Sequence, residues 1–154
     1  MVTLNGVKIV IEVDNNPDLS HLGVYSDDGS APGSIDRQER GDMGHGEYRY
    51  FAPANPEYAE ADYARYEAYN RDDWQMVGLW AEAELIVGPG PKAGLAQTIR
   101  SGGLWGIESD SGRDFFEETA EEELARLRGQ LRELGVPLDM FEAMAERAID
   151  EMGV

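Results

Sequence analysis

The fold is decided by the stretch WQMVGLWAEAELIV, residues 74–87. Every second residue from Val77 to Val87 is apolar, and the intervening positions include Trp80, Glu82 and Glu84. Because successive side chains of a strand point to opposite faces of a sheet, this alternation predicts one long strand with an apolar face. The Gly-Pro pairs at residues 88–91 predict that the strand ends there.

Shorter strands on both sides of this stretch complete a predicted antiparallel sheet. Downstream, residues 95–99 and 104–107 are two apolar segments separated by Ser-Gly-Gly, which predicts a meander of three strands. Upstream, Asn5-Gly6 separates residues 2–4 from the alternating residues 7–13. Asn-Gly is a strong signal for a two-residue turn, so we expect an N-terminal hairpin.

Between these strands the sequence predicts a long loop and one helix. Residues 14–54 are rich in glycine, proline and turn-forming pairs, which predicts a loop that drapes over the core through scattered apolar anchors. A helix then begins, with Asn55 as a good N-cap and Pro56 at the first helical position. Its tyrosines, out to about Asn70, predict a buried aromatic stripe.

Two amphipathic helices end the sequence. Ser111 is the predicted N-cap of the first, whose apolar residues recur at helical spacing up to Leu134. Gly135 ends this helix and Pro137 opens the next, which predicts an αα-hairpin over one sheet face. The expected fold class is therefore α+β: a single domain over residues 1–154, in which an antiparallel β-meander with an N-terminal hairpin is packed by one central helix and a C-terminal αα-hairpin.

Charge is the outstanding property of the composition. The 154 residues include 31 acidic and 13 basic side chains, a net charge of −18. A field of this sign repels phosphate backbones and anionic lipid, which argues against direct binding to nucleic acid or to a membrane surface. Two interpretations remain. Either the charge keeps the protein dissolved, or an acidic surface engages a basic partner, such as a protein that normally holds DNA or RNA.

The absence of cysteine excludes disulfides, thiolate zinc sites and a cysteine nucleophile. Residues 1–13 lack the basic region and the small-residue cleavage site of a signal peptide. No apolar run approaches the roughly 20 residues of a membrane span. We therefore expect a cytoplasmic protein.

Acidic clusters are the candidates for chemistry. One of them, near the first strands, comprises Glu12, Asp14, Asp18 and His21. Carboxylates with an imidazole can hold a divalent cation, but this spacing matches no calcium loop and no zinc motif. A local turn at Asp18 explains the cluster equally well, and we favour that interpretation.

A second acidic cluster lies on the predicted sheet and at its end: Glu82, Glu84, Glu108 and Asp110. Paired carboxylates can share a proton or hold a magnesium ion in hydrolysis, whereas a solvated acidic face is the simpler interpretation. Nucleophilic catalysis lacks its parts, because the sequence has only two histidines, His21 and His45, and no Gly-x-Ser-x-Gly elbow. No phosphate-binding loop occurs either, and we expect no cofactor.

Two sets of charged residues are candidates for partner binding. The first lies on the outer side of the helix that follows Ser111: Asp114, Glu117, Glu118, Glu121 and Glu122. Successive helical turns are about 5.4 Å apart, so such a row can imitate a track of phosphates, although a charged outer face is ordinarily just solvated. The second set is Arg37, Arg40 and Arg49, which either pair with local carboxylates or contact an anionic group of a partner.

Three blocks of the sequence resemble a known family: PDLSHLGVYS at residues 17–26, the segment 34–51 with IDRQERGDMG, and SGGLWGIESDS at residues 101–111. The resemblance is to an uncharacterised family of short bacterial proteins associated with phages, prophages and plasmids. It covers most of the chain and is weakest in the C-terminal helix. It implies a mobile-element protein that acts in a bacterial cytoplasm.

The expected function is that of a non-enzymatic, acidic protein that binds a host protein with a basic surface. In the setting of a mobile element, this suggests an anti-CRISPR or anti-restriction inhibitor that occupies a nucleic-acid channel. One alternative is a metal-dependent hydrolase that uses Glu82, Glu84 and Glu108, or Glu12 and Asp14. The other is a structural or regulatory accessory protein, for instance a homodimer formed through exposed Trp80 and Met76.

Overall fold

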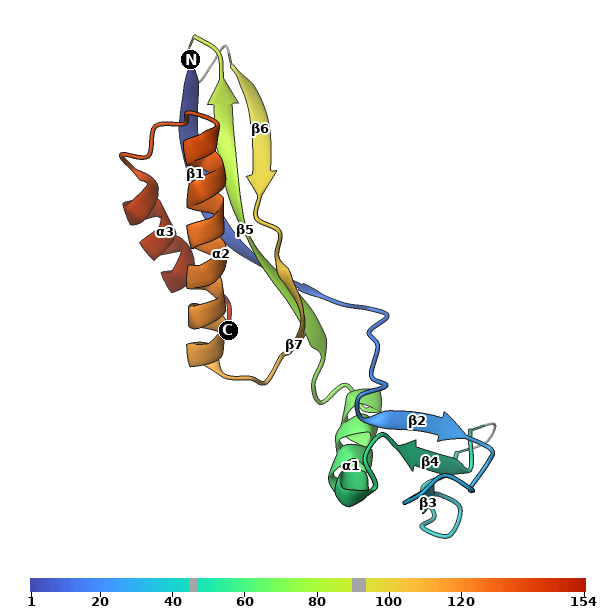
Figure 1. Cartoon of the computed structure of the whole chain (residues 1–154). Helices are drawn as coiled ribbons and strands as arrows, with labels where there is room; N and C mark the ends of the chain where they lie inside the picture. Colours follow the sequence, from blue (N-terminus) through green and yellow to red (C-terminus); the bar gives the residue numbers. More distant parts are fainter. Residues whose placement is uncertain (45–46, 90–93) are drawn as a thin grey trace. The chain divides into compact units, whose positions relative to one another are not determined.

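The computed structural model describes residues 1–44, 47–89 and 94–154 (Figure 1). Its contacts divide the chain into two compact units, residues 1–15 with 76–154 and residues 16–75, where the sequence suggested a single domain. Each unit has its own antiparallel sheet and its own helices, so the fold class is α+β as predicted.

The larger unit is built around the predicted long strand. Strand β5 (Met76–Val87) pairs with β1 (Val2–Val13) on one side. On its other side it pairs with both β6 (Leu95–Arg100) and β7 (Leu104–Glu108). Strands β6 and β7 therefore follow one another along the same edge of β5, and the predicted three-strand meander is wrong. Of the predicted break after β5, Gly90 and Pro91 lie outside the described residues.

The predicted N-terminal hairpin is also wrong, because β1 continues straight through Asn5-Gly6. The register steps from Leu4 opposite Leu85 to Gly6 opposite Glu84, so Asn5 is an extra residue in a β-bulge. This insertion changes which residues face the core. Even-numbered Leu4 and odd-numbered Val7 both pack against the same apolar cluster, which regular alternation forbids.

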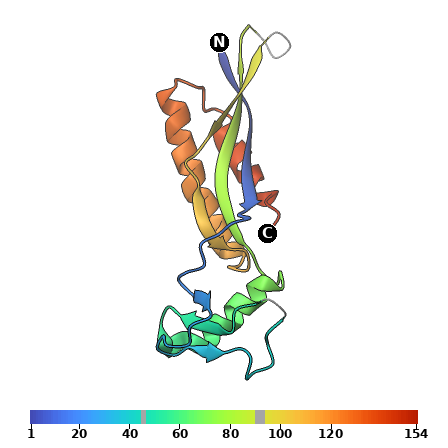
Figure 2. The same cartoon turned by 90° about the vertical axis from the view of Figure 1, so that its right-hand side faces the viewer.

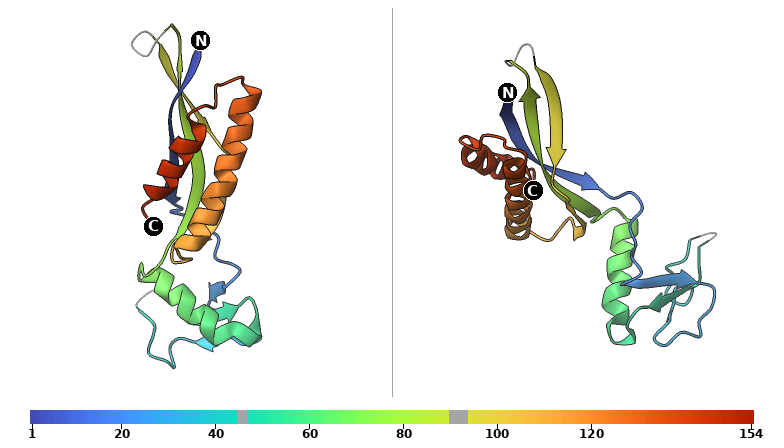
Figure 3. Two further views of the ribbon diagram at one scale, coloured as in Figure 1. Left: turned by 90° about the vertical axis from the view of Figure 1, so that its left-hand side faces the viewer. Right: turned by 45° about the horizontal axis from the view of Figure 1, so that its top comes forward.

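Helices α2 (Arg113–Glu133) and α3 (Phe141–Asp150) form the predicted αα-hairpin and lie on one face of this sheet (Figures 1 and 3). Leu127 and Leu131 of α2 and Phe141 of α3 are buried against Ala81, Ala83 and Leu85 of β5. Toward the start of α2, Phe116 and Ala120 pack with Val77, Leu79 and Ile107. The predicted cap of α2 differs: Gly112 precedes the helix, and Ser111 Oγ donates to the Glu108 carbonyl at 2.6 Å.

Residues 16–75 form the second unit, whose structure departs from the predicted loop. Short strands β2 (Gly23–Ser26), β3 (Ile35–Asp36) and β4 (Tyr50–Pro53) make a sheet in the order β2-β4-β3 (Figure 2). The predicted central helix is α1 (Ala59–Asn70), which packs on β4 of this small sheet. It follows a 3-10 turn (Pro56–Tyr58), where Asn55 accepts from the Glu57 amide at 3.0 Å, as its predicted capping role requires.

An aromatic cluster forms the core of this second unit. Phe51 of β4 is fully buried, and its ring lies 5.3 Å from that of Tyr63 and 5.6 Å from that of Tyr25. Tyr66 lies 4.7 Å from Tyr25 in an edge-to-face arrangement. Of the predicted stripe, Tyr63 is buried, Tyr66 and Tyr69 are half-buried, and Tyr58 is 56% exposed, so the stripe is confirmed only in part.

Candidate partner-binding surface

Helix α2 has two chemically different faces. Its apolar stripe is buried at helical spacing: Phe116, Ala120, Leu124, Leu127 and Leu131. The predicted partner-binding carboxylates lie at the surface in the first half of the same helix. Asp114, Glu118, Glu121 and Glu122 are exposed, and the side chain of Glu117 is 40% exposed.

Most of these carboxylates form no ion pair with another residue that the structure describes. Arg113 Nε donates to Glu117 Oε1 at 2.8 Å, so Glu117 is paired. Within the part of the chain that the structure describes, Asp114, Glu118, Glu121 and Glu122 make no ion pair. Their charge is therefore available to an external cation.

Helix α3 adds further negative charge to the helical hairpin. Residues 113–154 contain 12 acidic and 5 basic side chains. Two of the arginines are bound within the hairpin: Arg128 Nε donates to Glu142 at 2.9 Å, and Arg147 Nε to Glu151 at 2.8 Å. Arg113 is also engaged, because its guanidinium donates to the carbonyl groups of Ile149, Met152 and Val154. The hairpin surface is thus predominantly anionic.

The three arginines predicted as partner contacts lie in residues 16–75, and all three bind carboxylates of that unit. Both terminal nitrogens of Arg40 donate to Glu60. Arg49 donates to Asp36 from Nε at 3.1 Å and from Nη2 at 2.8 Å. These hydrogen bonds hold the pKa values of the Glu60 and Asp36 carboxyl groups below their usual range. The structure therefore contains the first of the two arrangements considered for these arginines, in which they pair with local carboxylates.

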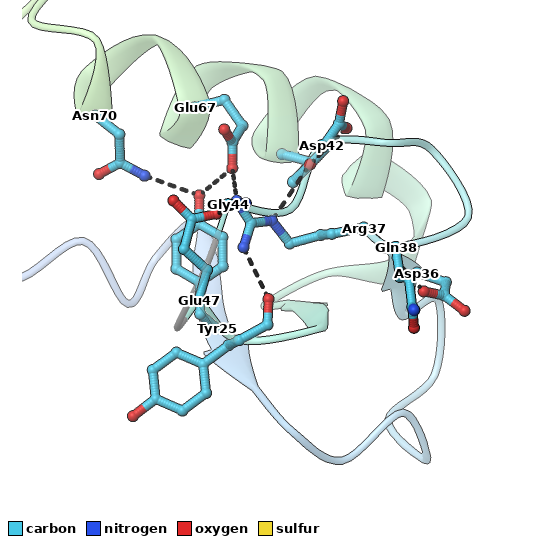
Figure 4. A network of polar contacts seen from close by, with 11 residues as sticks. Tyr25, Asp36, Arg37, Gln38, Asp42, Gly44, Glu47, Glu67 and Asn70 are labelled. Carbon is cyan, nitrogen blue, oxygen red and sulfur yellow. Dashed lines mark hydrogen bonds and ion pairs between the residues drawn. The ribbon is translucent and has the colours of Figure 1, made fainter.

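Arg37 is the centre of a polar network between the loop that follows β3 and helix α1 (Figure 4). Only 4% of it is exposed, so it does not face a partner. Its Nη1 donates to the Tyr48 carbonyl at 2.8 Å, and Nη2 donates to Glu47 at 3.0 Å and to Glu67 at 3.1 Å. The guanidinium also lies 4.7 Å from the centre of the Tyr25 ring.

Two tyrosine hydroxyls extend this network. Tyr25 donates to Glu67 at 2.7 Å and accepts from Asn70 at 3.0 Å. Tyr63 donates to Asp42 at 2.7 Å. Burial, together with these bonds to carboxylates, raises the pKa of both phenols, which keeps them neutral donors. The network fastens the loop to α1 and is a scaffold in this unit.

The predicted carboxylate clusters are not assembled as metal sites. Glu82 forms an ion pair with Lys8 and accepts a hydrogen bond from the Trp80 indole, and Glu84 accepts one from Asn5 at 2.6 Å. Asp18 accepts from the Ser20 amide at 2.9 Å, which is the local turn expected there. Across the described residues no group of three or more His, Asp or Glu side chains is arranged to hold a metal ion. His45 lies outside them.

Glu123 is a buried carboxylate that the sequence analysis missed. Only 1% of it is exposed, and it accepts from Ser101 Oγ at 2.9 Å and from the Gly103 amide at 2.6 Å. Arg126 pairs with its second oxygen. Since Ser101 also accepts from the Ala81 amide, this cluster joins α2 to the break between β6 and β7. The sequence does contain a signal for this burial: the glutamate lies within the apolar spacing of the helix, beside Leu124 and between Ala120 and Leu127.

The predicted homodimer contact through exposed Trp80 and Met76 is wrong in its premise. Trp80 is 4% exposed and Met76 is 6% exposed. Arg100 covers the Trp80 ring at 3.9 Å, and Trp105 lies against it at 5.9 Å between centroids. Both side chains therefore already have neighbours within the chain.

In residues 1–44, 47–89 and 94–154, no helix has the length and apolar character needed to cross a bilayer. Comparison with known proteins gives no relative, since no family model, no curated protein and no solved structure matches the chain.

Proposed function

We propose that this protein binds another protein that carries a basic surface, and that it does so through the exposed carboxylates of α2. The observation that carries the proposal is that Asp114, Glu118, Glu121 and Glu122 share one helix and form no ion pair with another described residue. A surface charge with no internal ion pair can bind an external cation without first breaking a pair within the protein. They also accelerate encounter with an oppositely charged protein.

The proposed consequence is competition with nucleic acid. A channel that binds DNA or RNA is lined with lysine and arginine, and carboxylates on successive helical turns offer it a ladder of negative charge. The resemblance of the three sequence blocks to a phage-, prophage- and plasmid-associated family supports a role against a bacterial defence system, such as CRISPR or restriction. In this proposal the protein acts in the host cytoplasm and without chemistry of its own.

A capture experiment tests the proposal. The tagged protein is incubated with bacterial lysate at about 50 mM and at about 500 mM salt, which differ several-fold in screening length. The expected result is capture of a nucleic-acid-binding protein at low salt, with weaker capture at high salt. The captured protein is then purified, and its affinity for its nucleic acid is measured with increasing amounts of the inhibitor.

A matched pair of variants assigns the effect to α2. The triple variant D114N/E118Q/E122Q removes three charges from the helix, and D27N/E39Q/E57Q removes three exposed charges from residues 16–75. The α2 variant should lose at least tenfold in inhibition, while the second variant should retain it. Equal loss in both variants, or capture of no nucleic-acid-binding protein at low salt, contradicts the proposal.

A further inference from the structure

A groove runs between α2 and α3 on the outside of the helical hairpin. Its volume is about 510 Å³. Its floor is apolar and includes Leu124, Phe141 and Ala145, which also belong to the core under the two helices. Two of the lining residues, exposed Ala125 of α2 and buried Ala145 of α3, have small side chains, which leaves space between the helices.

The rim of this groove is acidic. Glu121 of α2 and Glu142 and Glu146 of α3 line it, with Arg128 as the one cation among the lining residues. Arg128 is already bound to Glu142 at 2.9 Å. Glu121 and Glu146 are exposed and form no ion pair with another described residue. An occupant of the groove therefore meets apolar side chains below and unneutralised carboxylates on both sides.

We infer that the groove binds a basic, amphipathic helix of the partner protein. Such a helix presents apolar side chains three and four residues apart to a groove, and its flanking lysines or arginines reach the rim. The charge of the rim selects this occupant over an acidic helix, since like charges would be brought together on both sides. The inference rests on the proposed function and specifies the partner element that the acidic hairpin recognises.

The test uses a defined probe, a synthetic helical peptide of leucine and lysine with its leucines spaced three and four apart. One control peptide has the same composition with the leucines scrambled around the helix, and another has glutamate in place of lysine. Binding to the full-length protein is measured by calorimetry, and the contact is located by methyl and amide chemical shifts. We expect the first peptide to bind more tightly than either control and to shift the signals of Leu124, Ala145 and Ile149.

Two matched pairs of variants separate the groove from the rest of the acidic surface. A125W fills the groove from an exposed position, whereas A143W places the same side chain at an exposed site on α3 outside it. E146Q removes a rim charge, and D150N removes a charge of the same helix that does not line the groove. We expect A125W to weaken peptide binding at least tenfold and E146Q about threefold, with A143W and D150N close to the unmodified protein.

Four outcomes overturn the inference. The leucine-lysine peptide does not bind, the scrambled peptide binds equally well, or A125W binds the leucine-lysine peptide as tightly as the unmodified protein does. In the fourth, the groove signals shift with protein concentration alone, which would assign the groove to a second copy of the chain. These outcomes are distinct from failure of the proposed function, because D114N/E118Q/E122Q leaves every groove-lining residue in place. If D114N/E118Q/E122Q loses inhibition while A125W leaves peptide binding unchanged, the proposed function stands and the inference about the groove is wrong.

Discussion

At Gly78 the absence of a side chain is what lets Trp105 lie against the sheet. A Cβ atom built on Gly78 would lie 2.4 Å from Cε3 of the Trp105 ring, far inside contact distance. Trp105 in turn packs beside Trp80, so one missing methyl group shapes the aromatic arrangement on this face of β5. The reason for this glycine is close approach and not an unusual backbone angle, since its φ is not positive.

The variant G78A should therefore displace Trp105. We expect a loss of about 1–3 kcal/mol in the free energy of unfolding, the usual cost of overpacking, measured by urea denaturation with far-UV circular dichroism. G102A is the matched control, because nothing lies within 4 Å of its added Cβ. In the background W105A, the same substitution at Gly78 should cost much less. An equal cost in both backgrounds would show that the clash with Trp105 is not the cause.

The role of Arg37 depends on the burial of its side chain. Removing its side chain leaves the Tyr48 carbonyl without this donor and leaves Glu67 without its cation, although Glu67 still accepts from Tyr25. We expect R37A to lower the free energy of unfolding by on the order of 3 kcal/mol, the scale for one partner lost from a buried ion pair. R49A breaks a more exposed pair and should cost much less.

Urea denaturation followed by the near-UV circular dichroism of the tyrosines measures this difference, since all seven tyrosines lie in residues 16–75. R37K provides a further check. A lysine keeps the charge but lacks the planar fork that contacts Glu47, Glu67 and the Tyr48 carbonyl together. Full stability of R37K would mean that charge alone holds the loop.

At the scale of elements, the bulge in β1 makes a prediction that the hairpin interpretation does not. Deleting Asn5 restores strict alternation, because Leu4 then directly precedes Gly6 and keeps its inward position opposite Leu85. We expect the deletion variant to fold, with a change in the free energy of unfolding within about 1 kcal/mol. A two-residue turn, by contrast, would not survive this deletion.

Deleting Lys8 is the control for this prediction. It moves Val7 to the opposite face of β1 while Ile9 and Ile11 stay inward, so the strand loses its continuous apolar face. We expect this variant to be strongly destabilised or unfolded by far-UV circular dichroism. If both deletions are tolerated equally, the register of β1 is not what fixes its pairing.

At the scale of the whole molecule, acid should weaken residues 16–75. Five carboxyl groups of this unit have lowered pKa values: Asp18, Asp28, Asp36, Glu47 and Glu60. Hydrogen bonds from Ser20, Ser30, Arg49, Gly44 and Arg40 are the respective main causes. A lowered pKa in the folded state contributes stability above the usual carboxyl pKa of about 4, and that stability is lost as the pH falls further.

We therefore expect the near-UV circular dichroism of the tyrosines to diminish below about pH 4 and to recover on neutralisation. The variant R49A should show a shallower acid transition, because Asp36 then has less stability to lose. A tyrosine signal that is constant down to about pH 2 would contradict the expectation.

How much of this architecture was predictable follows from the range of the interactions. The long strand β5, the amphipathic α2 and the N-cap at Asn55 are set by patterns within a few residues, and the structure contains all three. The acidic face of α2 was predictable for the same reason, since helical spacing alone separates it from Leu124 and Leu127. The burial of Arg37, by contrast, depends on Glu67 at a distance of thirty residues in sequence.

By itself the sequence determined the α+β class, the long central strand, the terminal helical hairpin and the net charge of −18, because propensity, alternation and composition are local or additive properties. Only the tertiary structure decided that Asn5-Gly6 is a bulge, that β6 and β7 share one edge of β5, and that Arg37 and Glu123 are buried. These features arise from contacts between segments far apart in the chain. Their free energy comes from packing and desolvation, which no single stretch of residues encodes.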